Sequence, residues 1–508
     1  MNYLDYVQMT TGQKISYKIK SFFTGIPGAI ATIFRVIGLF FKSLFVFIGN
    51  GFKNYGKRFS DGDAGTKLSY IIMGAGSIMH KQIGKGLVFL AAQIGYIVFM
   101  VNFGSIYLSK IYCNNVTIQS RPGKIFNGVV GSEAPIKKMT LLKEEVINQD
   151  SIDDSNKILL FFCLTIMVTI AFFAFYIMNT KSAYASEQII KEGKQPMGTV
   201  EELKMFLDDR FHVTLLSVPI TLLLIFNVLP IIFTVCLAFT NYDEDHLAPG
   251  TLYWWVGFKN FADVFYSNPM KSETFGKVLL WTLVWAVFAT FSNYILGIIL
   301  ALMINKKEIK FKGFWRTMFV ITAAVPQFVT LLVMRTLLDD KAGFNALFGT
   351  QIPFLSDVAW ARVMVIVVNI WVGVPYTMLI SSGLLMNIPE DLYESARIDG
   401  ANAVQQFTKI TFPYIFFVTT PYLITTFVGN INNFNVIFFL TRGGPNPASY
   451  YRAGQTDLLV TWLYKLTVET NDFNLAAVIG IFVFVVCASG SLITFNMSKS
   501  AKNEEEFS

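Results

Sequence analysis

Long apolar runs separated by short polar connectors dominate the chain. Eight of these runs can cross a bilayer at the helical rise of 1.5 Å per residue, since about 20 apolar residues suffice. The pattern therefore predicts an all-α integral membrane protein with about eight transmembrane helices. The predicted spans lie near residues 86–108, 158–180, 213–239, 278–304, 317–338, 363–386, 414–440 and 474–496.

A ninth apolar run, near the N-terminus, has a different pattern. Arg35 and Lys42 lie seven residues apart on one helical face, with Phe, Ile and Leu elsewhere. We interpret residues 22–49 as an amphipathic helix that lies in the cytoplasmic interface of the membrane. No cleavable signal is apparent, because residues 1–20 are polar and no small-residue cleavage pattern clearly follows the apolar run.

Composition agrees with a membrane protein. Of the 508 residues 53% are hydrophobic and 15% are charged, whereas soluble domains carry about 25% charged residues. A soluble globule, a collagen and a disulfide scaffold are therefore excluded. The net charge is +7, and the Lys and Arg residues that cause it lie mostly between the apolar runs, where anionic lipid head groups attract them. Nucleic acid is therefore not an expected partner. The cysteines and histidines show no metal-ligand spacing, so no metal site is expected.

Positive charge sets the predicted orientation. Residues 1–85 contain eleven Lys and Arg, and the connector at 306–316 contains five more. Cytoplasmic loops are enriched in these residues, so both segments are predicted to be cytoplasmic. With an even number of spans, both termini then lie in the cytoplasm.

The span interiors almost lack ionisable side chains. Within the predicted limits only Arg335, near one end of a span, is charged. Ion-coupled carriers commonly place carboxylates or histidines at membrane depth to bind the coupling charge. A self-sufficient secondary carrier is therefore the weaker alternative. A membrane-embedded enzyme is weaker still, because no nucleophile, base or metal cluster converges in the pattern.

Neutral polar residues instead occur at helical spacing in two spans. In the span at 363–386, Asn369, Gly373 and Tyr376 occur at i, i+4 and i+7, which places them on one face. The stripe is about 10 Å long by helical rise. That length suits one or two sugar rings.

The span at 414–440 repeats this spacing. Thr426, Asn430 and Asn433 occupy i, i+4 and i+7, and Gly429 lies one turn before Asn433. Because the two spans run in opposite directions, both stripes lie at comparable depth.

Two interpretations of these stripes stay open. Amides, a hydroxyl, an aromatic ring and glycines without net charge suit an uncharged polyhydroxylated solute. Alternatively, the asparagines join helices, each hydrogen bond contributing about 0.6–2 kcal/mol. Asn432 and Asn435, on the other side of the same helix, are better candidates for joining helices.

The polar connector at 388–413 predicts a helix, a break and a second helix. Pro389 suits a first helical position, and Glu390 and Asp391 lie favourably at the positive end of the helix dipole. Gly400 can adopt the left-handed conformation that ends a helix. By itself this pattern fits an amphipathic connector as well as a functional loop.

The spacing in this connector resembles the EAA loop of ABC-importer permease subunits, in which Glu-Ala-Ala is followed by Gly and then Ile-x-Leu-Pro. Ser395 and Phe412 depart from that consensus, whereas Ile410 matches it. In the family this loop is the coupling helix that docks into a groove of a cytoplasmic ATPase subunit. The residues implied to couple are Glu394, Ser395, Ala396, Asp399, Gly400 and Pro413.

A wider resemblance covers approximately residues 213–500, which are similar to the larger permease subunit of maltose/maltodextrin importers. It implies the type I ABC importer permease fold and assigns sugar contacts to both polar stripes. Where the maltose subunit has a phenylalanine, this chain has Gly429, which implies a wider pocket. The segments that carry the resemblance are 239–242, 257–261, 325–327, 441–446, 456–459 and 473–477. The implied sugar-binding residues are Asn369, Gly373, Tyr376, Thr426, Gly429, Asn430 and Asn433.

The predicted spans, the charge distribution and the resemblance together give an expected organisation for the chain. A basic cytoplasmic region at 1–85 is followed by two additional spans at 86–212, with an extracellular loop at 109–157. The permease core at 213–500 follows, and a cytoplasmic tail at 501–508 ends the chain. The short extracellular loop at 240–277 is typical of a Gram-positive relative.

No phosphate-binding loop occurs in the sequence, so nucleotide chemistry must come from another subunit. The expected assembly is a multi-pass complex of the bacterial plasma membrane. Its other components are a second homologous permease subunit, two ATPase subunits that bind ATP and Mg²⁺, and an extracellular, lipid-anchored or periplasmic sugar-binding protein. The expected cargo is a neutral oligosaccharide, most simply maltose or maltodextrin, with another neutral oligosaccharide as the alternative.

Overall fold

The computed structural model describes residues 49–111, 155–247, 253–306 and 308–497, with scattered positions from 35 to 46. Most of the predicted interfacial helix at 22–49, most of the loop at 109–157 and all of the tail at 501–508 lie outside the described residues. The described residues are mostly helical, and the β pairing found among them is one isolated bridge between Thr240 and Trp255.

Seven helices or helix runs are long and apolar enough to cross a membrane, and a bent pair supplies an eighth candidate. Each corresponds to one predicted span, so the prediction of about eight spans is confirmed on length and composition. The seven are Ile83–Ser109, Ser155–Lys191, Phe211–Leu237, Pro269–Asn305, Val358–Leu385, Ala403–Leu440 and Phe473–Leu492, and the bent pair is Lys312–Thr322 with Gln327–Leu337.

The bent pair shows that the predicted span at 317–338 is broken within its length. Helix α14 (Lys312–Ala324) ends at the extended residue Val325, and α15 (Gln327–Leu337) begins after Pro326. The two helices meet at 83°. A proline ring disfavours helical geometry in the residue before it and donates no backbone hydrogen bond, so the helix stops there.

The chain divides into two compact units. Unit 1 contains Phe261–Asn471 and the chain from Val478, and unit 2 contains Gly38–Asn260 and Asp472–Ala477. Residues 213–260 thus group with the preceding helices, whereas the predicted domain organisation places a boundary at 213. The physical reason is that α11 (Leu229–Leu237) packs against α8 (Ser155–Lys191).

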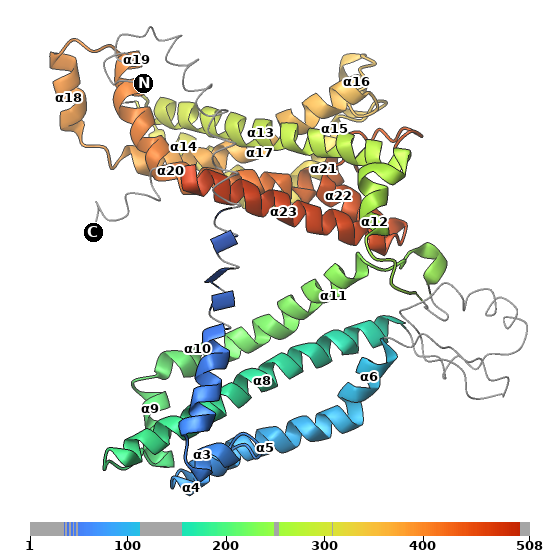
Figure 1. The fold of residues 1–508 in the computed structure, drawn as a ribbon. Coiled ribbons are helices and arrows are strands. Elements are labelled where there is room, and N and C mark those ends of the chain that lie inside the picture. The colour runs from blue at the N-terminus through green and yellow to red at the C-terminus, as the bar shows by residue number, and fades with distance from the viewer. Residues whose placement is uncertain are drawn as a thin grey trace, which may run out of the picture. The chain divides into compact units, whose positions relative to one another are not determined.

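In unit 2, helices α5, α8 and α11 run side by side (Figure 1). The rings of Tyr96 on α5 and Phe172 on α8 stack with centroids 3.9 Å apart. The elements are α3 (Ala64–Leu68), α4 (Ala75–Met79), α5 (Ile83–Phe99), η1 (Met100–Gly104), α6 (Ser105–Lys110), α8, α9 (Thr199–Leu207), α10 (Phe211–Leu223), η3 (Leu224–Val228), α11, η4 (Glu244–His246) and α12 (Lys259–Ala262).

Unit 1 is arranged around α13 (Pro269–Asn305), which lies beside α17 (Val358–Leu385) and α20 (Phe412–Ile431) (Figure 1). The remaining elements are η5 (Asp263–Ser267), α14, α15, α16 (Gly343–Phe348), α18 (Glu390–Ile398), α19 (Ala403–Gln406), η6 (Phe407–Thr411), α21 (Phe434–Leu440), α22 (Leu459–Tyr464), η7 (Lys465–Glu469) and α23 (Phe473–Met497).

Two glycines allow α13 and α17 to pack closely. A β-carbon on Gly297 of α13 would lie 2.6 Å from the Thr377 β-carbon of α17, and a β-carbon on Gly373 of α17 would overlap the amide of Asn293 on α13. Each helix therefore presents a glycine to a polar side chain of the other. Small residues let membrane helices approach in this way, because van der Waals packing and hydrogen bonds drive their association.

Indole hydrogen bonds attach other segments to α13. The Nε1 of Trp285 donates to the backbone oxygen of Asn430 over 3.0 Å. The Nε1 of Trp281 donates to the backbone oxygen of Thr456 over 3.1 Å. The hydroxyls of Tyr294 and Thr419 lie 2.7 Å apart and also share a hydrogen bond. These bonds fix α20 and the loop after α21 against the same helix.

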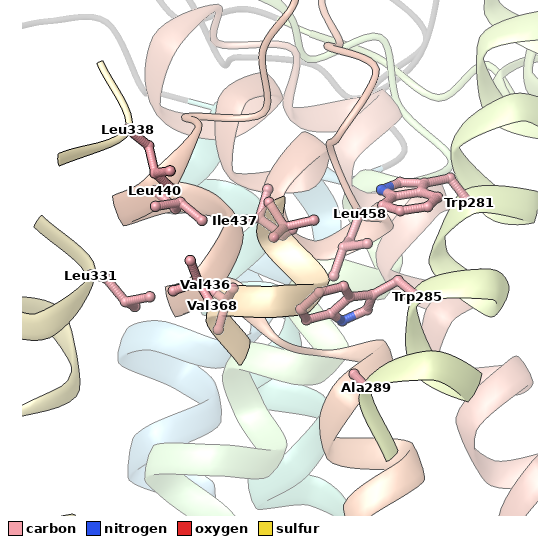
Figure 2. Close-up of a cluster of buried hydrophobic side chains, with 11 residues drawn as sticks. Trp281, Trp285, Ala289, Leu331, Leu338, Val368, Val436, Ile437, Leu440 and Leu458 are labelled. Carbon is pink, nitrogen blue, oxygen red and sulfur yellow. The ribbon is translucent and has the colours of Figure 1, made fainter. Parts of the chain in front are cut away.

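A cluster of buried apolar side chains fills the space between these elements (Figure 2). The indoles of Trp281 and Trp285 extend into the cluster from α13. They face aliphatic side chains of α15, α17 and α21 and that of Leu458. Tryptophan suits this place because its ring fills volume while its N–H reaches a carbonyl. The members are Trp281, Trp285, Ala289, Leu331, Leu338, Val365, Val368, Val436, Ile437, Leu440 and Leu458.

A buried ion pair holds the segment between α21 and α22. The carboxylate of Asp457 is fully buried and lies 2.6 Å from the Nζ of Lys465. It also accepts hydrogen bonds from the Gly454 N–H (2.6 Å) and the Thr461 hydroxyl (2.9 Å). A buried charge needs such partners to offset its lost hydration.

The glycine contact gives a prediction for Gly297→Ala. The added β-carbon has no room against Thr377, so the substitution should lower the free energy of unfolding by about 1–3 kcal/mol, the usual effect of overpacking. The measurement is thermal unfolding of the purified complex in detergent.

Gly276 is the matched control, since it lies on the same helix and a β-carbon there meets no atom within 4 Å. Gly276→Ala should leave stability unchanged or raise it, because alanine favours helix by about 1 kcal/mol. Equal behaviour of the two variants would contradict the close contact of α13 and α17.

Candidate substrate-binding site and coupling loop

The stripe predicted on α17 lies on one continuous helix, but its residues have different surroundings. Asn369 is only 5% exposed, and its Nδ2 has no hydrogen-bond partner among the described residues. Gly373 packs against Asn293 of α13. Tyr376, in contrast, is 56% exposed. The face therefore runs from a buried amide to an accessible aromatic ring.

Tyr422 of α20 joins this face and was missed by the sequence analysis. Its ring centroid lies 6.4 Å from that of Tyr376, at an interplanar angle of 42°. Tyr422 lies four residues before Thr426, so the helical spacing that identified Thr426 also points to it. The two rings and the half-buried Thr426 form a neutral aromatic and hydroxyl surface between α17 and α20.

Gly429 continues this surface one turn beyond Thr426. It is exposed, and a β-carbon at this position would meet no heavy atom within 4 Å. The space beside it is therefore open within the described part of the chain. This geometry is compatible with the wider pocket that a glycine at this position implies.

Asn430 lies in a different environment from Thr426 and Gly429. It is 8% exposed, and its Nδ2 donates to the hydroxyl of Thr290 on α13 over 2.9 Å. Its Oδ1 accepts a hydrogen bond from Asn433 over 3.3 Å. Both ends of the amide are thus engaged within the protein, which favours the helix-joining interpretation for Asn430.

Asn433 corrects the expectation of a continuous helical face. Helix α20 ends at Ile431, and Asn433 is the N-cap of α21, with its Oδ1 accepting from the Val436 N–H over 3.2 Å. Asparagine is a preferred N-cap because its side chain satisfies an otherwise unpaired helical N–H. The break places Asn433 outside the regular spacing from Thr426.

The two asparagines predicted to join helices lie near other elements. The Nδ2 of Asn432 is 3.4 Å from the Sγ of Cys487 on α23. The Nδ2 of Asn435 donates to Oε1 of Gln327 on α15 over 3.2 Å. Both contacts confirm the helix-joining prediction for this side of the segment.

The predicted coupling loop forms a helix, a break and a helix. Helix α18 has no buried residue and projects beyond the ends of α17 and α20 (Figure 1). Pro389 is its N-cap rather than its first helical residue. Gly400 has φ +77°, as predicted for the residue that ends the helix, and Pro413 lies in the first turn of α20.

The side chains of this loop are mainly accessible. Glu394 and Ser395 are exposed and Ala396 is half-buried, while Asp399 is the C-cap of α18. A hydrogen bond of 2.9 Å between the hydroxyls of Tyr393 and Thr411 anchors α18 to η6. The loop is thus attached at one side and leaves its charged face uncovered within the described chain.

Comparison with known proteins identifies the family. Residues 293–502 match the family described as the inner membrane component of binding-protein-dependent transport systems. The galactooligosaccharides transport system permease protein of Bacillus subtilis is 36% identical over 444 residues, which cover 86% of this chain and 98% of that protein. The chain belongs to the permease family of ABC importers.

Two further relatives show how far the similarity extends. The maltodextrin transport system permease protein of Bacillus subtilis is 33% identical over 86% of this chain and 96% of that protein. The maltose/maltodextrin transport system permease protein of Escherichia coli is 34% identical over 51% of this chain and 52% of that protein. The Bacillus alignments are therefore longer than the segment 213–500 and reach into the additional helices.

Family membership decides between the function classes left open by the sequence. The chain is a membrane-embedded transport subunit of an ATP-driven importer, not an enzyme and not a self-sufficient carrier. The predicted resemblance to ABC-importer permeases is confirmed. Which residues contact substrate and ATPase stays a prediction from the geometry described above.

The geometry around Asn430 gives a prediction that separates its two interpretations. Asn430→Ala and Thr290→Ala should each lower stability by about 0.6–2 kcal/mol, because both remove the same interhelical hydrogen bond. The double variant should lose little more than either single variant. Thermal unfolding and sugar-binding affinity of the detergent-solubilised complex measure the two roles separately. A large loss of affinity in Asn430→Ala alone, with stability unchanged, would instead make this amide a sugar ligand.

Proposed function

We propose that the chain transports a neutral oligosaccharide, with maltodextrin as the first candidate, and binds it at a surface formed by α17 and α20. The observation that carries the proposal is the pair of tyrosines, Tyr376 and Tyr422, beside Thr426 and the open position at Gly429. Aromatic faces offer apolar area to the C–H face of a sugar ring, and hydroxyls and amides offer hydrogen bonds to its hydroxyls.

The absence of charge on these helices supports an uncharged cargo. Between residues 363 and 385 and between 412 and 440 the sequence has no Asp, Glu, Lys, Arg or His. A charged solute would need counter-charges or metal ions to offset the loss of its hydration at membrane depth. A neutral sugar exchanges its water hydrogen bonds for those of neutral side chains.

Asn369 supports the same proposal from the buried end of the surface. Its Nδ2 has no partner among the described groups, and an unpaired buried donor costs about 1–3 kcal/mol. A hydroxyl of the cargo would satisfy it. In this assignment Asn369, Tyr376, Tyr422 and Thr426 contact the sugar, Gly373 and Gly429 provide space, and Asn430 and Asn433 maintain the shape of α20 and its break.

A galactooligosaccharide is the second candidate cargo. The Bacillus relative named for galactooligosaccharides is 36% identical to this chain, compared with 33% for the maltodextrin relative. Both classes are neutral chains of hexoses, so the same surface chemistry serves either. The open space at Gly429 controls which ring geometry and branching fit.

The assembly and orientation follow from the same proposal. A second permease subunit and two ATPase subunits, which bind ATP and Mg²⁺, would complete the importer, and an extracellular or lipid-anchored binding protein would deliver the sugar. The exposed α18 would dock on an ATPase through Glu394, with Ser395, Ala396 and Asp399 at the contact. Gly400 and Pro413 would set the direction of the connection to α20. Both termini would be cytoplasmic in a bacterial plasma membrane.

Uptake competition tests the cargo. Proteoliposomes containing the complete importer and its binding protein should take up radiolabelled maltotriose, and unlabelled maltodextrins should compete at least about tenfold better than charged uronate oligomers. Tyr376→Ala should flatten this preference, because it removes an aromatic face worth about 1 kcal/mol or more. Preferential competition by galactooligosaccharides would replace the first candidate with the second, and selection of the charged oligomers would refute a neutral cargo.

The exposed Glu394 gives a prediction on coupling. Glu394→Ala should lower sugar uptake at least about tenfold while the chain still inserts into the membrane, because truncating one charge of a buried interface pair costs about 2–5 kcal/mol. Uptake and co-purification of the ATPase are measured together. Glu390→Ala, at the start of the same helix, is the matched control and should retain most uptake. Normal uptake in Glu394→Ala would count against docking through this carboxylate.

A further inference from the structure

The short helices α3 and α4 of unit 2 have polar side chains inside and apolar side chains outside. Thr66, Ser69 and Ser77 are fully buried, and His80 is 5% exposed. Five large apolar side chains point outward instead, and Ile71 among them is 72% exposed. The exposed apolar residues are Leu68 (40%), Ile71 (72%), Ile72 (44%), Ile78 (37%) and Met79 (56%).

Water would favour the opposite arrangement. Each large aliphatic side chain is about 1.5–3 kcal/mol more stable when removed from water, so five exposed ones in one short segment are unfavourable in an aqueous loop. A contiguous apolar patch of this kind marks a protein or membrane contact. Acyl chains remove the cost without requiring any directional partner.

The backbone of the turn between the two helices forms hydrogen bonds within the protein. Several of its backbone polar groups are paired by side chains of the neighbouring helices. Gln93 of α5 accepts from the Met73 N–H (2.7 Å) and donates to the Ile71 oxygen (2.9 Å). Asn179 of α8 accepts from the Gly74 N–H (2.9 Å) and donates to the Ser69 oxygen (3.0 Å).

Such pairing is what non-helical backbone requires at membrane depth. A third side chain, Tyr176 of α8, donates to the Tyr70 oxygen over 2.7 Å. Gln93 lies ten residues after Ile83, about 15 Å along α5 at 1.5 Å per residue. Asn179 likewise lies twelve residues before Lys191, where α8 ends. The turn is thus beside helices α5 and α8, not beyond their ends.

Ionisable side chains form contacts where α3 begins and α4 ends. The Asp63 carboxylate pairs with His80 at 2.9 Å, and Glu187 of α8 accepts hydrogen bonds from the Asp63 N–H (3.0 Å) and the Thr66 hydroxyl (2.7 Å). Lys67 is exposed at the last turn of α3. Lys81, equally exposed, follows α4. Exposed lysines beside an apolar face suit anionic lipid head groups.

We propose that residues 64–82 are a lipid-contacting element, with α3 and α4 immersed in the leaflet at the N-terminal end of α5 and their aliphatic side chains against acyl chains. Lys67 and Lys81 then lie at the level of the head groups. The proposal assigns to the bilayer a segment that the sequence pattern places in the basic cytoplasmic region at 1–85.

Continuity with a membrane span favours lipid over a protein partner. The apolar face continues onto α5 through Ile83 (59% exposed), Leu87 (53%) and Val88 (60%). These residues belong to a helix that is long and apolar enough to cross the bilayer. An apolar face on both sides of Lys81 that continues onto a candidate span has the chemistry of a lipid contact.

Site-directed spin labelling of the full importer in liposomes tests the proposal. In a background in which the four cysteines are replaced, Ile71→Cys and Met79→Cys are labelled separately with a nitroxide. Collision rates with oxygen, which concentrates in acyl chains, and with a water-soluble nickel chelate are then compared. Val88→Cys on α5 is the lipid-facing control, and Lys194→Cys, 72% exposed after α8, is the aqueous control.

Labels at positions 71 and 79 should favour oxygen over nickel as the label at position 88 does, by at least about threefold relative to the label at position 194. Nickel accessibility equal to that at position 194 would show a water-exposed face and overturn the proposal. Immobilised labels shielded from both reagents would show a protein partner on this surface and would also overturn it. Since all four positions are on the surface, the substitutions leave the buried polar contacts in place.

Discussion

The close packing of α13 against α17 is the contact on which the arrangement of unit 1 depends. Two glycines, Gly297 and Gly373, each accept a polar side chain of the opposite helix. This reciprocal contact fixes the rotation of α17, because a turn about its axis would drive a β-carbon or a side chain into the neighbouring backbone. The indoles of Trp281 and Trp285 then attach α20 and the loop after α21 to the same face of α13.

The asparagines of the membrane region have distinct functions as a result. Asn430 and Asn432 have their amides engaged with α13 and α23, so their chemistry is used within the protein. The remaining surface consists of the rings and hydroxyls of Tyr376 and Tyr422 and of the open space beside Gly429. A surface of this composition can bind an uncharged, hydroxylated chain without placing any charge at membrane depth. Energy for transport must then come from outside the membrane region, as family membership indicates.

Much of this fold could be predicted because each decisive signal is local. A run of about 20 apolar residues identifies a span wherever it occurs, and Gly400 has the positive φ that its position after an acidic short helix indicates. The break at Pro326 and the cap at Asn433 were harder, since hydropathy averages over both. Tyr422 was missed because the predicted stripe began at Thr426, one turn too late.

The segment at 64–82 shows why other features could not be predicted. Its helices have five residues each, too few for a hydropathy window, and its pattern inverts the usual relation between polarity and exposure. Contacts with side chains on other elements, such as Gln93 and Asn179, are needed to reveal that the polar side is the inner side. The separation of Asn430 from the accessible surface likewise depends on Thr290, 140 residues away in the chain.

The central claim is that uncharged side chains on α17 and α20 receive the cargo while Asn430 stays bonded to α13. A cryo-electron microscopy map of the complete importer, trapped with oligosaccharide in the membrane region, measures this directly. The account predicts sugar density against the rings of Tyr376 and Tyr422, with the Asn430 amide still within hydrogen-bond distance of Thr290. Sugar density away from both tyrosines, or an Asn430 amide turned from Thr290 to the sugar, would contradict it.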